Sequence, residues 1–483
     1  MSITNALNNA ISGLTANARG AEVVSANLAN ALTPGYAKRE LELSSQNLGG
    51  ASGGVQVNGI NRIISQSLLS DHRQADAAVG RSSVAADFYL RLEKAIGLPG
   101  DTDSLGGRLS RLDSALIAAT SRPDNEMRLT EVAHAAGDLA AGLRMISDQI
   151  QQSRTDADRE IGRQVAALND GLTEVARLNR QIIIQKANNR DASALEDARQ
   201  AAIGRISSIV PVRELPRDNG RIALFTVGGA VLLDGKDPTE ISFSTAGRFS
   251  PEMSVDNHPV ARLMIEDEPL TDGRMALFSG GSLSALFALR DELAPGAQNQ
   301  IDAMAHELYM RFAGADDTRP ADAPGLFTDA GGALDNDNVL GFAGRISLNA
   351  LVDPGQSGEL WRLRDGIGAD APGDVGRSAL LEAMSTAMGE NRPYSASGTP
   401  ISAGNLGALA GAVLSSASSQ RMQADATYTH NLAMRNALDS AIAGQGVDSD
   451  KELEMLLQLE RAYAANARVI RVVDEMLAEI LRI

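Results

Sequence analysis

Both ends of the chain carry an apolar stripe with the spacing of a coiled-coil seam. Steps of three and four residues keep side chains on one face of an α-helix, and such spacing over about four heptads is typical of helices that pack side by side. The sequence therefore predicts two terminal helices whose apolar edges need a neighbouring helix. The N-terminal stripe consists of Ile3, Leu7, Ala10, Leu14, Asn17, Ala21, Val24 and Leu28. The C-terminal stripe consists of Leu456, Leu459, Tyr463, Asn466, Ile470, Val473, Leu477 and Ile480.

Each stripe contains one asparagine, Asn17 in the first and Asn466 in the second. A lone polar residue inside a seam commonly fixes the register of the helices at a cost in stability. Both asparagines are equally compatible with a solvent-facing place at the edge of the seam. The pattern fits both interpretations.

The stripes are too thin to hold two helices together firmly. Burying one large aliphatic side chain contributes about 1.5–3 kcal/mol, whereas ordering the backbone costs roughly 1–2 kcal/mol per residue. Several stripe positions are Ala or Asn, so two such helices barely break even when they contact each other alone. We expect both ends to be frayed in a free subunit and ordered once other subunits cover them.

The N-terminal helix should stop before Pro34, because proline lacks an amide donor and disfavours helical geometry in the residue before it. Thr33, Pro34, Gly35 and Tyr36 then supply the residue types of a turn.

Between the two ends, segments with helical periodicity alternate with segments of strand-like or irregular pattern. Residues 123–187 show helical periodicity without an internal proline after Pro123, which predicts one very long helix or two collinear helices spanning about 90 Å at 1.5 Å per residue. Residues 209–281 alternate apolar and polar side chains between turn residues, as in an antiparallel β domain. Helical pattern returns at 282–291 and 298–312, and a β-rich or irregular stretch follows at 316–373. A Ser/Ala-rich helical segment at 404–443 leads into the C-terminal stripe.

These patterns predict a mainly α fold with inserted β domains, in which a discontinuous bundle of long helices is assembled from both halves of the chain. Gly49 to Gly54 is expected to be a loop, and a short strand is expected at 55–60. The predicted domains are the terminal coiled-coil helices (1–34 plus 448–483), a helical bundle (35–208 plus 282–313 plus 395–447), a β domain (209–281) and a second small β-rich or irregular domain (314–394).

Composition excludes several classes of function. The chain has no cysteine, which rules out disulfides, thiolate metal sites and cysteine nucleophiles. A formal net charge of -17 would repel the phosphates of a nucleic acid. The longest apolar runs fall far short of the ~20 residues of a membrane-spanning helix, so no membrane insertion is expected. The N-terminus lacks the pattern of a cleaved signal peptide.

The sequence presents no catalytic, cofactor-binding or metal site. The segment from Gly50 to Gly54 fits G-x-S-x-G with Ser52 in the centre, but its Gly-rich context favours a flexible turn over a nucleophile elbow. The five histidines are scattered singly, without the spacing of metal ligands. The segment from Asp335 to Asn338 begins like a calcium loop, but Leu340 occupies the place of the required glycine, so a polar turn is expected. Gly228 and Gly229 lie in a strand-like pattern and predict a hairpin or bulge.

Several segments resemble known flagellar proteins. Residues 25–40, SANLANALTPGYAKRE, resemble the signature shared by flagellar rod, hook and hook-associated proteins. Similarity to the FlgK family then continues in the family's order through 178–189, 227–235, 279–296 and 301–308. The most specific block is VDSDKELEMLLQLERAYAANARVIRVVDEMLAEIL at 447–481. Two departures, ALEDARQA at 194–201, which retains Asp197 and Arg199, and YMRFAGADDTRP at 309–320, suggest altered local turns.

The resemblance implies a structural subunit of the bacterial flagellum at the junction of hook and filament, located outside the cell and secreted without a cleaved signal peptide. It implies as partners identical subunits in a junction ring, hook subunits, a second hook-associated protein, the flagellar type III export apparatus and a dedicated export chaperone on the C-terminal helix. The alternatives are another flagellar axial protein, such as a hook subunit or a flagellin-like protein, and a secreted coiled-coil adhesin or effector. A secreted enzyme on a flagellar scaffold would need a catalytic constellation in the β insertion, and the sequence shows none.

Overall fold

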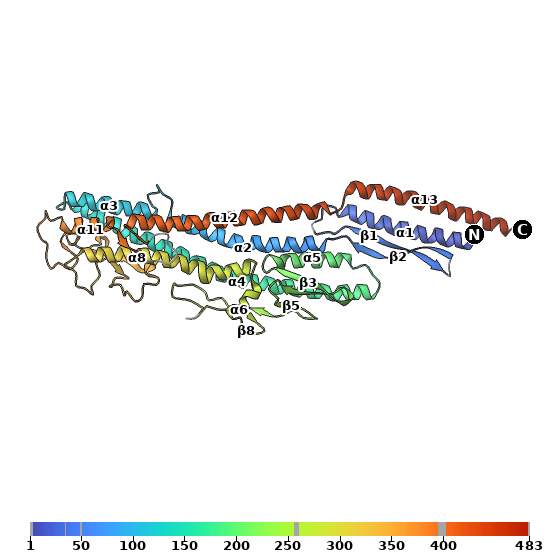
Figure 1. Ribbon diagram of the computed structural model, residues 1–483, viewed down its shortest axis with the longest axis horizontal. Coiled ribbons are helices and arrows are strands. Elements are labelled where there is room, and N and C mark those ends of the chain that lie inside the picture. The colour runs from blue at the N-terminus through green and yellow to red at the C-terminus, as the bar shows by residue number, and fades with distance from the viewer. Residues whose placement is uncertain (1–2, 34, 49–50, 256–259, 395–401, 482–483) are drawn as a thin grey trace. The chain divides into compact units, whose positions relative to one another are not determined.

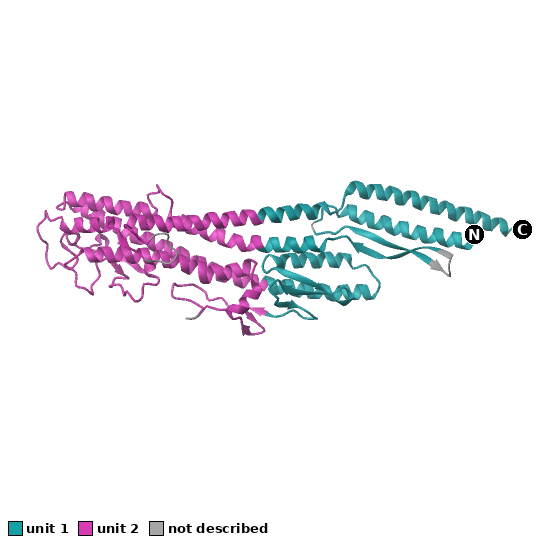
Figure 2. Cartoon of the chain, in the orientation of Figure 1, with its two compact units in different colours: residues 1–77, 167–240, 432–483 teal, residues 78–166, 241–431 magenta. Residues whose placement is uncertain are grey.

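The structure is a computed structural model that describes residues 3–33, 35–48, 51–255, 260–394 and 402–481. Long α-helices dominate it and its sheets are small and antiparallel, so the predicted fold class is confirmed. The chain divides into two compact units (Figure 2). Unit 1 comprises residues 1–77, 167–240 and 432–483, and unit 2 comprises residues 78–166 and 241–431. The four-part division expected from the sequence stays a prediction.

Three long helices contribute residues to both units: α2 (Gln66–Ile96), α4 (Glu126–Ala187) and α12 (Leu406–Gly444). The 62 residues of α4 form one helix, the first of the two forms expected from the sequence. Asn125 caps its first turn, because its side-chain oxygen accepts the Met127 amide at 2.9 Å. Beyond its end Asn189 adopts a left-handed backbone with φ 53°, a common way for a helix to stop.

Unit 1 contains the two chain ends. Its helices are α1 (Ile3–Ala29), α5 (Ser193–Ser207) and α13 (Ser449–Ile480). A long hairpin pairs β1 (Arg39–Leu48) with β2 (Ala51–Arg62) and packs against α1. A three-stranded antiparallel sheet is formed by β3 (Val212–Pro216), β4 (Ile222–Thr226) and β5 (Val231–Leu233).

The hairpin corrects one detail of the sequence analysis. The strand expected at 55–60 is present within β2, but Gly53 and Gly54, expected in a loop, also belong to β2. The partner strand β1 was not predicted. Leu41 and Leu43 alternate with glutamates there, and this strand signal is short beside the neighbouring helices. The expected turn at Gly228 and Gly229 is present between β4 and β5, where Gly229 has φ 99°.

Unit 2 holds most of the remaining secondary structure, much of it short. Its longer helices are α3 (Leu105–Ser121), α7 (Ser282–Ala288), α8 (Ala294–Ala315) and α11 (Ala379–Gly389), and a π-helical turn η3 (Leu289–Leu293) joins α7 to α8. Its strands are β6 (Ile241–Ser242), β7 (Met264–Ile265), β8 (Glu268–Pro269), β9 (Phe327–Asp329), β10 (Ile346–Leu348), β11 (Arg392–Pro393) and β12 (Ala403–Gly404). Its short helices are α6 (Asp272–Met275), α9 (Phe342–Arg345) and α10 (Arg362–Asp365).

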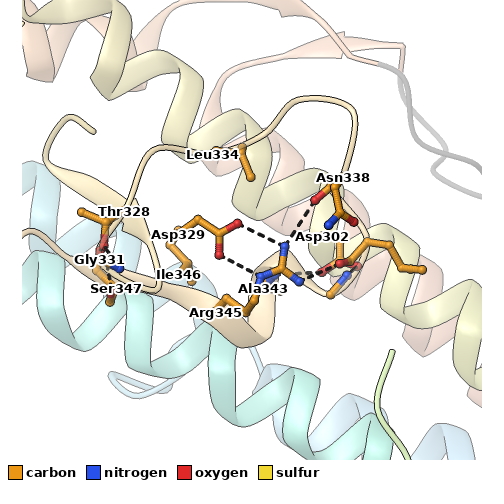
Figure 3. Close-up of polar contacts among 12 residues, drawn as sticks. Asp302, Thr328, Asp329, Gly331, Leu334, Asn338, Ala343, Arg345, Ile346 and Ser347 are labelled. Carbon is orange, nitrogen blue, oxygen red and sulfur yellow. Dashed lines mark hydrogen bonds and ion pairs between the residues drawn. The ribbon is translucent and has the colours of Figure 1, made fainter. Parts of the chain in front are cut away.

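Buried charges hold the irregular segments of unit 2 against its helices. Asp302 on α8 accepts the backbone amides of Gly341 at 2.7 Å and Ala343 at 2.8 Å. Beside it the Arg345 guanidinium donates two hydrogen bonds to the Asp329 carboxylate, at 2.8 and 3.1 Å (Figure 3). Burial raises the pKa of Asp302, although these amides oppose the shift. The segment from β9 to β10 is thereby tied to α8.

A second buried pair ties the π-helical turn to α4. The Arg290 guanidinium lies 2.8 Å from the Asp158 carboxylate, and both side chains are almost wholly inaccessible to water. Arg154, also on α4, donates to the backbone carbonyl of Arg290 at 2.9 Å.

A membrane-spanning helix would need a longer apolar stretch than any helix of the described residues offers.

Candidate assembly site at the paired terminal helices

The two terminal helices α1 and α13 lie side by side in unit 1, with both chain ends at the same end of the pair (Figure 1). They run antiparallel, because Gly13 lies against Asn466 and Gly20 lies against Leu459. A Cβ atom at Gly13 would come within 2.7 Å of the Asn466 amide, and one at Gly20 within 3.1 Å of the Leu459 side chain. The two glycines are seven residues apart, so one face of α1 allows α13 to approach closely at successive heptads.

The predicted stripes meet each other only in part. In the N-terminal stripe Ala10 and Val24 are buried, and the half-buried positions are Ile3, Leu7, Leu14, Asn17, Ala21 and Leu28. In the C-terminal stripe Val473 is buried, and the half-buried positions are Leu456, Leu459, Asn466 and Ile470. Three members stay open to solvent, with exposed fractions of 49% for Tyr463, 38% for Leu477 and 56% for Ile480.

The larger apolar surface of the pair lies on α13. This helix buries two residues, Glu452 and Val473, whereas α1 buries six and is also covered by the β1–β2 hairpin. An apolar groove of about 440 Å³ runs between the start of α1 and the last third of α13. The exposed large apolar residues of α13 are Leu453, Met455, Leu457, Tyr463, Val469, Val472, Met476, Leu477 and Ile480. Such a surface can accept the apolar side of another helix.

The buried side-chain amide of Asn27 links the helix pair to the turn after α1 and to β1. The Asn27 side chain, 1% exposed, donates to the Arg39 carbonyl at 2.9 Å and to the Glu452 carboxylate at 3.0 Å. Its oxygen accepts the Tyr36 hydroxyl at 2.9 Å and the Arg39 amide at 3.0 Å. One residue thus joins α1, the turn after it, β1 and α13.

Asn27 was not predicted as a site residue. Asn17 and Asn466 were the polar positions expected in the stripes, and Asn466 does lie at the helix contact against Gly13. Asn27 belongs to the SANLANALTPGY segment, where its place before a turn was the available signal. Its partners Tyr36 and Arg39 lie beyond the helix end and Glu452 lies 425 residues away, so the pattern of one helix does not show them.

An ion-pair network extends this junction. The buried Glu452 carboxylate lies 3.3 Å from the Lys38 ammonium. Burial opposes the charge of Lys38, but the hydrogen bonds and charges of its acidic partners raise its pKa overall. Asp197 on α5 contacts both Arg39 at 3.1 Å and Arg62 at 2.6 Å, the two residues paired at the open end of the hairpin. Asp197, a residue retained from the family pattern, therefore ties the hairpin to α5.

The turn after α1 follows directly from its residues. The helix ends at Ala29, and the Thr33 amide donates to the Asn30 carbonyl at 2.9 Å. Gly35 has φ 81°, a left-handed conformation that glycine adopts without strain. The Tyr36 amide donates to the Thr33 carbonyl at 3.2 Å, while burial raises the pKa of the Tyr36 hydroxyl. Pro34 lies outside the described residues.

The described residues contain no group of three or more potential ligands that could hold a metal ion. Ala51 to Gly54 begin strand β2, which is not the turn between strand and helix that a nucleophile elbow requires, and Gly50 lies outside the described residues. At the calcium-like segment the Asn338 amide donates to the Asp335 carbonyl at 3.0 Å, as in the expected polar turn.

Comparison with known proteins gives consistent matches along most of the chain. Residues 7–36 match the family of flagella basal body rod proteins, and residues 439–483 match the C-terminal family of flagellar basal body rod FlgEFG proteins. Residues 90–316 match the helical domain of the flagellar hook-associated protein FlgK.

Individual relatives are distant in sequence. Flagellar hook-associated protein 1 of Bacillus subtilis strain 168 is 22% identical, over 94% of this chain and 93% of its own length. The protein of the same name from Salmonella typhimurium strain LT2 is 24% identical, over 66% of this chain and 57% of its own length. The solved hook junction protein FlgK of Burkholderia pseudomallei matches 54% of this chain and 46% of its own, at 19% identity and a TM-score of 0.42.

The matches at both ends are with flagellar rod-type proteins, and they lie on α1 with the turn after it and on α13 with the end of α12. Within that class the helical-domain match and the relatives show a protein of FlgK type, a structural protein of the flagellum. The chain spans nearly the whole length of the Bacillus relative and little more than half of the Salmonella one.

Proposed function

We propose that this chain joins the flagellar hook to the filament as a ring of identical subunits and carries out no catalysis. The observation that carries the proposal is the surface of α13, on which nine large apolar side chains stay exposed beside its antiparallel partner. An exposed apolar surface does not stabilise a free protein. Burial of the same surface between neighbouring copies would stabilise the assembly by about 25 cal/mol per Å² of apolar area. The curated relatives are named hook-associated protein 1.

The geometry suits lateral packing of copies. Helices α1 and α13 already pack against each other within one subunit. The groove between them has room for a side of a neighbouring copy, and it is lined by Ile3, Ala6, Val469, Val472 and Met476. Packing there would bury apolar residues that the free subunit leaves half-exposed. In the free subunit the burial energy of these helices only balances the entropy cost of ordering them. The added packing would then make them stably ordered.

The further partners belong to the same proposal. Hook subunits and a second hook-associated protein would contact the two ends of the ring. The flagellar type III apparatus would export the chain unfolded and without a cleaved signal peptide to the outside of the cell. A dedicated chaperone would hold α13 beforehand by taking its apolar face into a groove.

Immunogold labelling of intact flagella tests the location. Label confined to the narrow zone between hook and filament is the expected result. Label along the whole filament would instead favour a flagellin-like subunit, and label along the hook would favour a hook subunit.

A charge placed in the groove tests the surface itself. We expect Val472→Asp to leave filaments detached even at matched amounts of secreted protein, because a carboxylate cannot be buried against a neighbouring copy without a partner. Arg471→Asp is the matched control, since Arg471 is exposed on the same helix and does not line the groove. Equal filament attachment in the two variants would remove this surface from the proposal.

A further inference from the structure

Unit 1 contains a second cleft, of about 290 Å³, where four segments meet. The turn after α1 forms one wall, and the start of α2, α5 and the end of α12 form the others. Its apolar lining includes Ile63, Ile64, Leu68, Leu69 and Ile442. Ile63 is 44% exposed, so the cleft presents an open aliphatic surface to solvent.

The charged side chains that line this cleft have partners inside the subunit. His72 Nε2 lies 2.7 Å from the Asp439 carboxylate, and its Nδ1 lies 3.3 Å from Asp76. Arg73 is bound by Glu214 and by the side-chain oxygen of Gln200. Since these charges are paired inside the subunit, the chemistry of the cleft favours an uncharged apolar side chain.

The same subunit displays such a side chain. Leu32, between the end of α1 and Gly35, is 97% exposed, more than any other large apolar residue among those described. It does not line the cleft, although Gly35 and Tyr36 of the same turn do. A leucine held in water adds nothing to the stability of the free subunit, so its surface is available to a neighbour.

We propose that Leu32 of one subunit inserts into this cleft of the next copy. The inference rests on the proposed function, because it describes a contact within the assembly of identical subunits. When the two copies are not related by a two-fold axis, such a contact is heterologous, and repeated from copy to copy it generates a ring or a helical array.

The size of the cleft favours a second copy over a separate partner. One leucine side chain buried there contributes a surface that is a small part of the about 1,200 Å² that a stable complex buries. A soluble partner held here alone would dissociate, whereas in an assembly each subunit donates one such contact and accepts another. The cleft is also continuous with the proposed interface, because Gln445 and Gly446 in its wall lead directly into α13.

Disulfide trapping tests the contact in a chain that has no cysteine of its own. One full-length copy carries Leu32→Cys with one epitope tag, and a co-expressed copy carries Ile63→Cys with another. After mild oxidation of purified flagella we expect a cross-linked pair that bears both tags. Leu32→Cys combined with Leu351→Cys, which is exposed but lies in unit 2, is the matched control and should give none.

Two results would overturn the inference. One is the absence of the two-tag product from flagella that contain both subunits. The other is a strong cross-link between two Leu32→Cys copies, which would show an isologous contact. Because cross-linking is scored in whichever flagellar structure contains the subunits, its outcome is separate from the immunogold result that decides the proposed function.

A second measurement does not depend on disulfide geometry. Leu32→Asn should leave the circular dichroism of the free subunit unchanged, since the residue is exposed, and should lower the fraction of flagella that keep their filaments at least twofold. The separate variant Leu32→Met should keep the wild-type fraction, because methionine also fills an apolar cleft. Full filament retention by Leu32→Asn would contradict the insertion.

Discussion

Asn27 joins four segments of unit 1 through one side chain, and its removal should be felt in all of them. Asn27→Ala leaves the Glu452 carboxylate and the Arg39 backbone groups without their amide partner in a buried place. Each unsatisfied buried polar group costs about 1–3 kcal/mol. We therefore expect the free energy of unfolding of unit 1 to fall by about 2 kcal/mol or more, measured by urea denaturation with a probe placed in that unit. Asn17→Ala is the control, because Asn17 is half-buried on the same helix. Equal losses in the two variants would deny Asn27 its special role.

Gly20 makes a residue-scale prediction about helix spacing. Its added Cβ would lie 3.1 Å from the Leu459 side chain, so a larger residue requires that this side chain or α13 itself shift. Gly20→Val should therefore weaken the helix pair, seen as faster amide exchange in both α1 and α13. Gly106, on an exposed turn of α3 with open space around it, provides the matched Gly→Val control for helix propensity. Unchanged exchange in α13 would show that the pair tolerates a wider spacing.

At the scale of the element, the two terminal helices differ in how well they are covered. α1 contacts both α13 and the β1–β2 hairpin, whereas α13 leaves most of its apolar residues exposed. We expect both to be frayed in the dilute free subunit, with α13 exchanging its amides faster than α1 in a hydrogen-exchange experiment. Strong protection of both helices in a dilute monomer would contradict the prediction made from their sequences.

The start of α13 should respond to pH through its cap. Asp448 accepts the amides of Asp450 at 3.1 Å and Lys451 at 3.3 Å. The hydrogen bond from the Lys451 side chain, together with these amides, lowers the pKa of Asp448. Because the folded pKa is depressed, the stabilisation is present above the unfolded pKa and is lost as pH falls through the folded one. Acidification should therefore speed amide exchange at the start of α13, and Asp448→Asn should flatten that dependence.

At the scale of the whole molecule, the C-terminal segment should decide assembly. Deletion of residues 447–483 removes α13 with its exposed surface and takes away the partner of α1. We expect the truncated chain to lose both chaperone binding and junction assembly, measured by pull-down and by filament attachment. A truncated chain that still assembles normally would show that α13 is not the assembly element.

The state of the free protein separates the proposal from a soluble coiled-coil adhesin or effector. A surface completed only by several neighbours gives weak pairwise association, so the full chain should sediment largely as a monomer at micromolar concentration. A coiled-coil adhesin would instead form a stable dimer through the same apolar residues. Sedimentation equilibrium distinguishes the two.

Local patterns in the sequence predicted the place and extent of several long helices. The heptad spacing from Ile3 to Leu28 and the proline at position 34 predicted α1, and the proline-free periodicity beyond Pro123 predicted α4 as one helix or two collinear ones. These features depend on residues within a few turns of one another, so one segment contains all the information. The class of protein was also recognisable, because the SANLANALTPGY and C-terminal blocks are contiguous.

Only the tertiary structure decided what each stripe contacts. It placed Gly13 and Gly20 against Asn466 and Leu459, and brought Asn27 to Glu452 across 425 residues of sequence. Periodicity shows that a helix has an apolar face, but not which distant face covers it or which polar group is buried with it. Those choices follow from packing and from the satisfaction of buried hydrogen bonds, which exist only once remote segments meet.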